Sequence, residues 1–203
     1  MPDPRLTPIV LEGRVVRLEP LGRAHLPALA RVALDPDLWA WTASHVETEA
    51  DLARYVEAAL DEQARGLALP FAVVERASGA VAGCTRFGNV AFAHGRTEIG
   101  WTFVGRAWQG TAVNPEAKRL MLAHAFETWG LNRVEFKTDA RNARSRAALA
   151  KLGAREEGTL RGHMITAMGR VRDTVYFSVL AGEWPAVRAH LDARIAALVG
   201  RGA

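Results

Sequence analysis

A run of nine residues, from Trp108 to Glu116 (WQGTAVNPE), constrains the fold more than any other part of the chain, because it joins an apolar segment to a long amphipathic one. Asn114 is a residue type that caps helix N-termini, and Pro115 suits the first helical position, where its missing N–H is not needed. Apolar residues then recur at helical spacing, which predicts a helix over 115–129. Unpaired N–H groups at a helix start, with the positive end of the helix dipole, favour an anion, so the run predicts a phosphate-binding loop.

The segments around this run alternate between strand-type and helix-type patterns. Three strand-like segments precede it and are separated by short turns, as in an antiparallel meander. The strand after the helix is expected to return parallel to the strand before the loop, through the helical crossover. The expected strands span 15–19, 71–75, 80–89, 97–104, 133–138, 156–163 and 171–180, and the expected helices span 25–34, 49–65, 115–129, 143–152 and 184–198. We therefore expect an α/β (α+β) fold with a mixed, mostly antiparallel sheet flanked by helices, in a single domain of residues 1–203 with a core over 14–181 and a C-terminal helix over 183–200.

The composition limits the classes of function. The 203 residues are 49% hydrophobic, which is enough for one sizeable core, and no apolar run is long enough to span a bilayer. The segment 1–14 lacks a signal-peptide core, so we expect a cytoplasmic protein without a membrane partner. A net charge of +4 suits a polyphosphate ligand, but no basic block with interleaved aromatic residues predicts nucleic acid. The six histidines lack metal-ligand spacing, so no metal is expected. The single cysteine, Cys84, is expected to be a buried structural thiol.

Four further motifs occur in a fixed order around the phosphate-binding loop. They are 11–15 (LEGRV), 98–101 (EIGW), 142–145 (NARS, opening a helix that ends at Gly153) and 172–176 (RDTVY). In this order and spacing the chain resembles, over nearly its entire length, the GNAT superfamily of acyl-CoA-dependent N-acetyltransferases. Within it the ribosomal-protein N-acetyltransferase (RimJ/RimL-like) type is the most similar. The resemblance implies the GNAT fold, with a splayed pair of parallel strands at the cofactor site, and acetyl-CoA as the co-substrate.

The resemblance also implies which residues hold acetyl-CoA. Backbone N–H groups of the loop would bind the pyrophosphate, through Gln109, Gly110, Thr111, Ala112, Val113 and Asn114. Ala112 stands where the family pattern has Gly, and Asn114 where it has Gly or Ala. Asn142 would fix the pantetheine arm, and backbone N–H groups of Trp101, Thr102 and Phe103 would polarise the thioester carbonyl.

Each of these assignments has a simpler alternative. The loop can be no more than a turn before a well-capped helix. Asn142 and Ser145 can stabilise the next helix locally, as its N-cap and first turn. Arg106, Arg144 and Arg146 can bind the cofactor's phosphates or remain solvated side chains.

Glu98 is the expected catalytic base, because acetyl transfer to an amine needs a group that removes a proton. Strand alternation puts Glu98, Gly100 and Thr102 on one sparsely filled face, opposite Trp101 and Phe103. The alternative is an exposed glutamate paired with an arginine such as Arg86 or Arg96. Many family members carry a tyrosine as the acid for the thiolate seven residues after the asparagine matching Asn142, but Leu149 occupies that position here. The resemblance makes Ser145 the candidate donor instead.

The loop between the first two helices is expected to help shape the acceptor site. Trp39 and Trp41 lie in this loop, and Tyr176 and His163 on the closing strands are further candidates for substrate binding. The expected reaction is direct transfer of the acetyl group to a primary amine, either a protein N-terminal α-amine or a small-molecule amine. The closing strands and the helix beginning at Trp184 offer a surface for a homodimer.

Two other functions are compatible with parts of the sequence. The departures at Ala112, Asn114 and Leu149 leave open a non-catalytic acyl-CoA-binding or regulatory module with the same fold. A dinucleotide-binding or P-loop protein is disfavoured, because the loop lacks both glycine fingerprints and antiparallel hairpins precede it.

Overall fold

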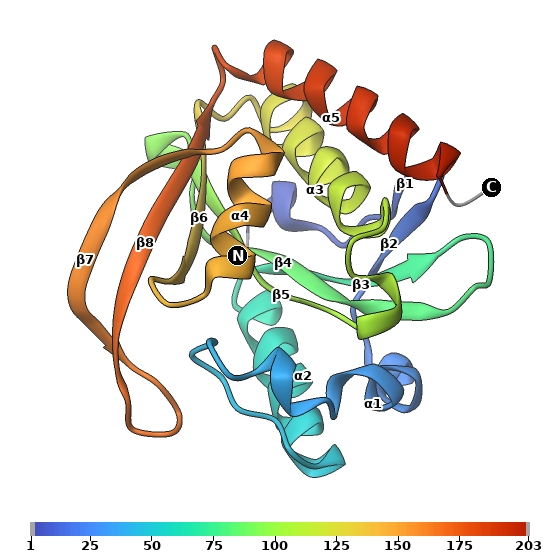
Figure 1. The fold of residues 1–203 in the computed structure, drawn as a ribbon, viewed down its shortest axis with the longest axis vertical. Coiled ribbons are helices and arrows are strands. Elements are labelled where there is room, and N and C mark those ends of the chain that lie inside the picture. Colours follow the sequence, from blue (N-terminus) through green and yellow to red (C-terminus); the bar gives the residue numbers. More distant parts are fainter. Residues whose placement is uncertain (1–2, 202–203) are drawn as a thin grey trace.

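The computed structural model describes residues 3–201, which form one eight-stranded sheet covered by helices on both faces (Figure 1). The strands are β1 (Leu11–Glu12), β2 (Val16–Pro20), β3 (Leu69–Glu75), β4 (Val81–Ala91), β5 (Arg96–Val104), β6 (Arg133–Asp139), β7 (Arg155–Ile165) and β8 (Val171–Leu180). The helices are α1 (Leu26–Ala33), α2 (Glu49–Ala64), α3 (Val113–Ala123), α4 (Ala143–Leu152) and α5 (Trp184–Gly200). The strand order is β1-β2-β3-β4-β5-β6-β8-β7, which confirms the predicted mixed, mostly antiparallel sheet.

One pair of neighbouring strands, β5 and β6, runs parallel, as the crossover through α3 predicted. Their pairing is short: it joins Arg96 to Arg133, Thr97 to Val134 and Glu98 to Glu135, and it continues no further. Beyond Glu98 the two strands part. The splayed parallel pair implied by the resemblance is therefore present in the middle of the sheet.

Helices α3 and α5 lie on one side of the sheet and α1 and α2 on the other (Figure 1), and an apolar core lies on each side. The α3-side core lies between the sheet and helices α3 and α5, and its largest buried side chains include Phe71, Phe87, Ile99, Met121, Phe136 and Leu191. The α2-side core lies under α1 and α2 and includes Leu29, Trp39, Leu52, Val56, Cys84 and Phe103. Central strands are buried on both faces, which explains why β3 is almost continuously apolar.

The start of α3 differs from the sequence prediction. The helix begins at Val113, so Asn114 and Pro115 are its second and third residues, and Asn114 is not the N-cap. Ala112 occupies the N-cap position with helical φ and ψ of −71° and −11°. The hydroxyl of Thr111 instead accepts a hydrogen bond from the N–H of Val113 at 3.3 Å, which supplies the local cap. Pro115 is tolerated because N–H groups of the first turn have no partner within the helix.

Other boundaries agree with the pattern to within a few residues. The bounds of α4 and β8 are as predicted, whereas β1 was not expected as a strand. The predicted third helix continues past Ala123 as a π-helical turn, His124–Thr128. Gly130 follows with a φ of +64°, the left-handed conformation expected of a helix-terminating glycine. None of the helices within residues 3–201 combines the length and the apolar character needed to cross a membrane.

Glu116, in the first turn of α3, connects this helix to the N-terminal strands. Its side chain is buried, and its carboxylate accepts hydrogen bonds from the backbone N–H groups of Arg14, Val15 and Val16, at 3.0, 2.6 and 2.7 Å. Gly13 lies directly against this carboxylate, where a Cβ would collide with it. The LEGRV motif and the start of α3 therefore form one hydrogen-bonded unit.

Candidate active site

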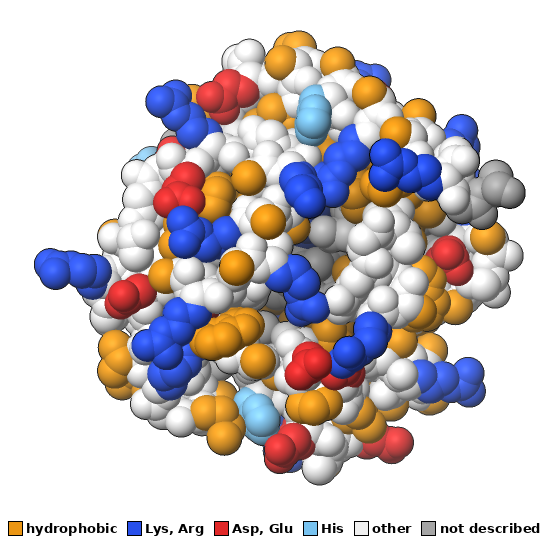
Figure 2. All heavy atoms as spheres, in the orientation of Figure 1, with side chains coloured by type: hydrophobic (Ala, Val, Ile, Leu, Met, Phe, Trp, Pro, Cys, Tyr) orange, Lys and Arg blue, Asp and Glu red, His pale blue; other side chains and the backbone are white. Residues whose placement is uncertain are grey.

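A cavity of about 420 Å³ opens where β5 and β6 part. Its lining comes from both sides of the sheet, with Lys118 of α3 and Ser145 of α4 on one side and Trp39 and Tyr55 on the other. Figure 2 shows a hollow near the centre of this face, between α4 and the start of α3, with Lys and Arg side chains around it. A cavity of this size suits a ligand that enters between the strands.

A β-bulge in β5 reshapes this cavity and corrects the predicted strand face. Cys84 pairs with Phe103 and Arg86 pairs with Gly100, so one residue of β4 faces two residues of β5. The extra residue is Trp101, whose backbone has a φ of +48°. The alternation expected from the sequence therefore fails after Gly100.

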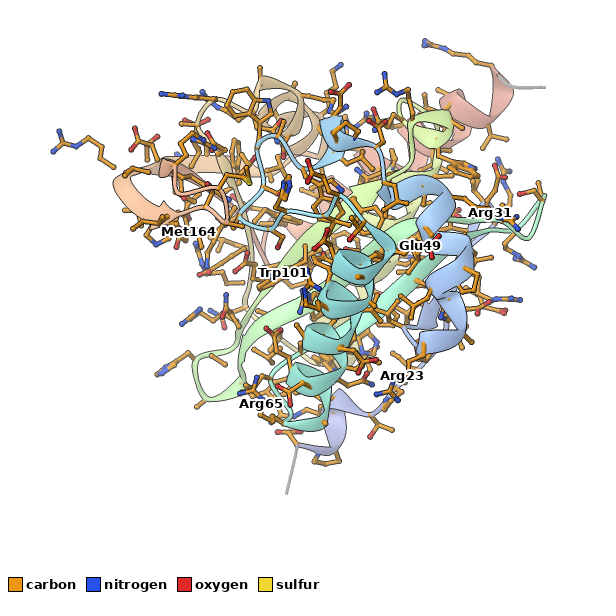
Figure 3. The ribbon with its side chains drawn as sticks, turned by 90° about the horizontal axis from the view of Figure 1, so that it is seen from below. Arg23, Arg31, Glu49, Arg65, Trp101 and Met164 are labelled. Atoms are coloured by element: carbon orange, nitrogen blue, oxygen red, sulfur yellow. The ribbon has the colours of Figure 1, made fainter. Side chains whose placement is uncertain are left out.

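From the bulge onward, the side chains of β5 lie on the opposite faces of the sheet from those predicted. The hydroxyl of Thr102 accepts a hydrogen bond from Lys118 of α3, so Thr102 does not share the face of Glu98. The ring of Trp101 lies instead on the α2 side, with the Arg86 guanidinium 4.5 Å from its centre (Figure 3). Phe103 packs in the α2-side core. The placement of Thr102 with Glu98, and of Trp101 and Phe103 on the other face, was wrong.

Glu98 lies at the last residue of the parallel pair and borders the cavity. It is only 6% exposed, and its Oε2 atom contacts the ammonium of Lys137 at 2.7 Å and accepts from the amide of Asn89 at 2.6 Å. Burial acts to lower the pKa of Lys137, but the hydrogen bond and charge of Glu98 outweigh it, so this pKa lies above its ordinary value. Glu98 is thus a buried, paired carboxylate rather than an exposed surface residue.

Neither arginine proposed as an alternative partner holds Glu98. Arg86 bonds to Glu62 of α2 at 2.7 Å, and Arg96 faces Glu135 at 3.6 Å. The Oε1 atom of Glu98 lies on the side of Gly100, where an added Cβ would stand 3.0 Å from it. The glycine therefore leaves the space beside the second carboxylate oxygen free of a side chain.

The predicted phosphate loop reaches the cavity through Gln109, Gly110 and Asn114. Gly110 has a φ of +79° with open space on its Cβ side, so a ligand can approach the backbone closely. The ordinary φ of Ala112 means that its methyl group introduces no strain. Within residues 3–201 the buried Oδ1 atom of Asn114 has no hydrogen-bond partner. An acyl-CoA, with its phosphates and amide N–H groups, fits a loop that opens a helix, lets a ligand approach the backbone at Gly110 and carries an unused acceptor.

The start of α4 both caps its own helix and borders the cavity. Asn142 is its N-cap, since the side-chain oxygen accepts from the N–H of Ser145 at 2.9 Å. Both side chains also line the cavity. Leu149 lines it too, so an apolar side chain occupies the position for which the resemblance implied a tyrosine.

Of the three arginines considered for phosphate binding, Arg144 lines the cavity. Its guanidinium donates to the side-chain oxygen of Gln109 at 2.7 Å, which links α4 to the phosphate loop. Arg106 is exposed and pairs with Asp35 at 2.9 Å, and Arg146 pairs with a glutamate of β7. Arg144 is therefore the arginine placed to meet a ligand.

Of the aromatic residues predicted for the acceptor site, some line the cavity and one does not. Trp39 is a buried residue of the α2-side core, with its indole N–H donating to the carbonyl of Ala33 at 2.6 Å, although its edge reaches the cavity. Trp41 is 38% exposed and borders the cavity, as does His163. The ring of Tyr176 packs beside that of His163, 5.8 Å away, and Tyr176 is not among the described lining residues.

A cysteine nucleophile or a bound metal would each support a different chemistry. Cys84 is buried, as predicted, and burial raises the pKa of its thiol to about 12, which makes it a poor nucleophile at neutral pH. No cluster of three or more histidine, cysteine, aspartate or glutamate side chains suited to a metal occurs within residues 3–201.

Lys118 is a cavity residue that the sequence analysis did not identify. It lies one helical turn after Asn114, is 5% exposed, and donates to the hydroxyls of Thr85 and Thr102 at 3.0 and 2.6 Å. Burial lowers the pKa of its ammonium to about 7. A lysine on the apolar face of a helix, three residues before the buried Met121, was the available signal.

Replacing Lys118 with methionine should change how stability depends on pH. The folded chain releases the Lys118 proton near pH 7, whereas the unfolded chain holds it to about pH 10.5. Between these values the unfolded state binds more protons, so rising pH should stabilise the wild type by up to about 1.4 kcal/mol per unit. Lys118→Met should lack this gain, and the exposed Lys151→Met should retain it. Urea unfolding from pH 7 to 10 tests this, and parallel curves for wild type and Lys118→Met would contradict it.

The fold and the divided sheet define the class of protein. Residues 16–155 match the family model for the acetyltransferase (GNAT) domain, so the chain belongs to the GNAT acetyltransferase family. Enzymes of this family use acetyl-CoA. The resemblance drawn from the sequence motifs is thereby confirmed.

The chain is similar in sequence to one known protein and in structure to two others. Over 106 residues the chain is 31% identical to the "Putative ribosomal N-acetyltransferase YdaF" of Bacillus subtilis (strain 168), covering 52% of this chain and only 57% of that protein. A GCN5-related N-acetyltransferase from Brucella melitensis is similar in structure, with a TM-score of 0.85, 34% identity, and 95% and 87% of the two chains covered. Mycobacterium smegmatis RimJ, solved in complex with CoA-disulfide, has a TM-score of 0.76, 27% identity, and 91% of each chain covered. The chain is therefore similar in sequence to a putative ribosomal N-acetyltransferase and in structure to RimJ and a GCN5-related N-acetyltransferase.

Proposed function

We propose that this chain transfers an acetyl group from acetyl-CoA directly to a primary amine. Family membership supports acetyl transfer, and the observation that carries the choice of an amine is the position of Glu98. Its carboxylate lies where the parallel strands part, with Oε2 held by Lys137 and Oε1 beside Gly100. We propose one acetyltransferase unit over residues 1–203, with its core over 14–181 and a C-terminal helix over 183–200.

In this proposal the neutral amine attacks the thioester carbonyl while Glu98 accepts the amine's proton through Oε1, directly or through a water molecule. Lys137 and Asn89 position the carboxylate. Backbone N–H groups of Trp101, Thr102 and Phe103 polarise the carbonyl, and the bulge supports this role because it exposes irregular backbone to the cavity. The carbon–nitrogen bond forms as the carbon–sulfur bond breaks, and the thiolate leaves with CoA.

The cofactor would be held at the other end of the cavity. We assign the pyrophosphate to the loop from Gln109 to Asn114, supported by Arg144, and the pantetheine arm to Asn142. The acceptor would enter on the side of Trp41, with Trp39 and Tyr176 as supporting residues around it. The name of the B. subtilis relative favours a protein N-terminal α-amine, and a small-molecule amine is the other acceptor class.

Two measurements on the full chain test the proposal. Calorimetric titration with CoA should show binding, and release of free thiol from acetyl-CoA should depend on an added amine. Binding of CoA without amine-dependent thiol release across a broad panel would favour a non-catalytic acyl-CoA-binding module instead. Failure to bind CoA would overturn the proposal.

Ser145→Ala tests the donor proposed for the leaving thiolate. Removal of one hydrogen bond to a developing charge should lower kcat on the order of tenfold or more, with the affinity for CoA nearly unchanged. Stability should change little, because the helix cap uses the backbone N–H of Ser145 and not its hydroxyl. Ser178→Ala, on β8, is a control without a place in the cavity. An unchanged kcat in Ser145→Ala would exclude this role for the hydroxyl.

A further inference from the structure

Arg172 on β8 is a buried cation that neither the cofactor site nor the proposed chemistry uses. Its side chain is 6% exposed and lines the cavity. Within residues 3–201 its Nε atom is buried without a hydrogen-bond partner. Burial also lowers the pKa of this guanidinium below its ordinary value. A buried charge of this kind is unfavourable unless a partner compensates it.

The carboxylates that act on Arg172 are already engaged. Asp139 and Glu98 both exert an attractive charge on it. Asp139, however, is paired with Arg170, and Glu98 is paired with Lys137 at 2.7 Å. Among residues 3–201, Arg172 is therefore left without an anion of its own.

The neighbouring residues place Arg172 at the acceptor end of the cavity. Val175 and Phe177 of β8 face the α3-side core, and Arg172 instead borders the cavity together with Glu98 and His163. The residues proposed to hold the pyrophosphate and the pantetheine arm lie elsewhere, on α4 and in the loop that opens α3.

The loop carrying Trp41 meets the hairpin of β7 and β8 at this end. The N–H of Ala167 donates to the carbonyl of Ala43 at 2.9 Å, and the guanidinium of Arg170 lies 5.4 Å from the centre of the Trp41 ring. Figure 3 shows Met164 on this hairpin, on the side of the molecule that carries α2 and Trp101. Arg172, on the same hairpin, borders the cavity that Trp41 and the proposed base Glu98 also line, and the charge of Glu98 acts on it.

The charges around the cavity are mostly positive. Glu98 is the one acidic side chain among its described lining residues and its charge is paired with that of Lys137, whereas the guanidinium groups of Arg144 and Arg172 have no carboxylate partner within residues 3–201. A polyamine would meet repulsion here. An acceptor with a negative group would compensate the charge that the protein leaves open.

We propose that Arg172 binds a carboxylate of the acceptor, and that the acceptor is a small amine that also carries a carboxylate, as an amino acid does. The inference rests on the proposed acetyl transfer. The guanidinium offers planar, paired N–H donors that match a carboxylate, and holding that group would orient the amine toward Glu98.

Paired acceptors test this proposal through kcat/KM for thiol release. Each pair consists of an amino acid and its amide, which share the amine and differ in the negative charge. The wild type should prefer the acid roughly ten- to hundredfold, the range of a hydrogen-bonded charge pair. Arg172→Gln should lose this preference by slowing the acid alone, and Arg172→Lys should retain part of it. The exposed Arg161→Gln, on the same hairpin, should behave as wild type.

A binding measurement separates this proposal from the proposed function. In thermal unfolding, an N-acetyl amino acid should raise the Tm of the wild type more than its amide does, and Arg172→Gln should abolish the difference while still binding CoA. This result needs no turnover, so absent thiol release with intact carboxylate binding would overturn acetyl transfer alone. If the wild type used and bound the acid and the amide equally well, the proposed role of Arg172 would be wrong. The same conclusion would hold if neutral peptides were better acceptors than amino acids.

Discussion

Glu98→Gln should lower kcat for amine-dependent thiol release by about 10² to 10⁴, the contribution typical of a positioned general base. The glutamine keeps the shape of the side chain and a hydrogen-bond acceptor but cannot take up the proton of the amine. The affinity for CoA should change little, because the proposed cofactor contacts lie on α4 and at the start of α3. Thiol release and calorimetric titration of the same preparations measure the two effects.

Two controls separate the chemistry of Glu98 from its ion pair. Glu135→Gln removes a buried carboxylate that is paired in register with Glu98 but does not border the cavity among the described residues, and it should leave kcat near wild type. Lys137→Met removes the cation from Oε2, and it should reduce kcat less than Glu98→Gln does. Equal losses in Glu98→Gln and Lys137→Met would mean that the carboxylate serves only to hold the lysine.

Glu116→Ala should destabilise the fold by about 3–5 kcal/mol, because one buried and two partly buried backbone N–H groups lose their acceptor at once. Glu116→Gln retains one oxygen and should cost about half as much. The exposed Glu49→Ala, in the first turn of α2, should stay within about 0.5 kcal/mol of wild type. Urea unfolding measures all three, and a Glu116→Ala loss below about 1 kcal/mol would show that water replaces the carboxylate.

The sequence was sufficient to predict the architecture because the relevant signals are local. Period-two alternation, turn residues and the crossover rule together predicted the meander, the parallel return of β6 and the bounds of α4 and β8. The small residues of the loop after β5 predicted a phosphate-binding site, and the position of Glu98 in the EIGW motif predicted a catalytic base; both remain predictions, although these residues do border one cavity. These features depend on neighbours that are close along the chain.

Features set by tertiary pairing were not predictable in the same way. The bulge at Trp101 depends on how β4 pairs with β5, and one extra residue reverses every later side chain. The burial of Lys118 and Arg172 depends on which elements pack over them, so their sequence context showed charged residues and not unpaired charges. The predicted N-cap at Asn114 failed because the helix begins one residue earlier, at Val113, and Thr111 supplies the cap two residues before that start.

The short parallel pairing has a mechanical consequence. The sheet consists of two hydrogen-bonded panels, β1–β5 and β6–β8–β7, joined edge to edge by three residue pairs. One panel carries Glu98 and the Trp101 bulge, and the other carries Lys137 and Arg172. A small rotation of one panel against the other about this short seam would change the width of the cavity without breaking hydrogen bonds inside either panel. The distance between the proposed base and the carboxylate-binding arginine would then vary with the angle between two rigid bodies.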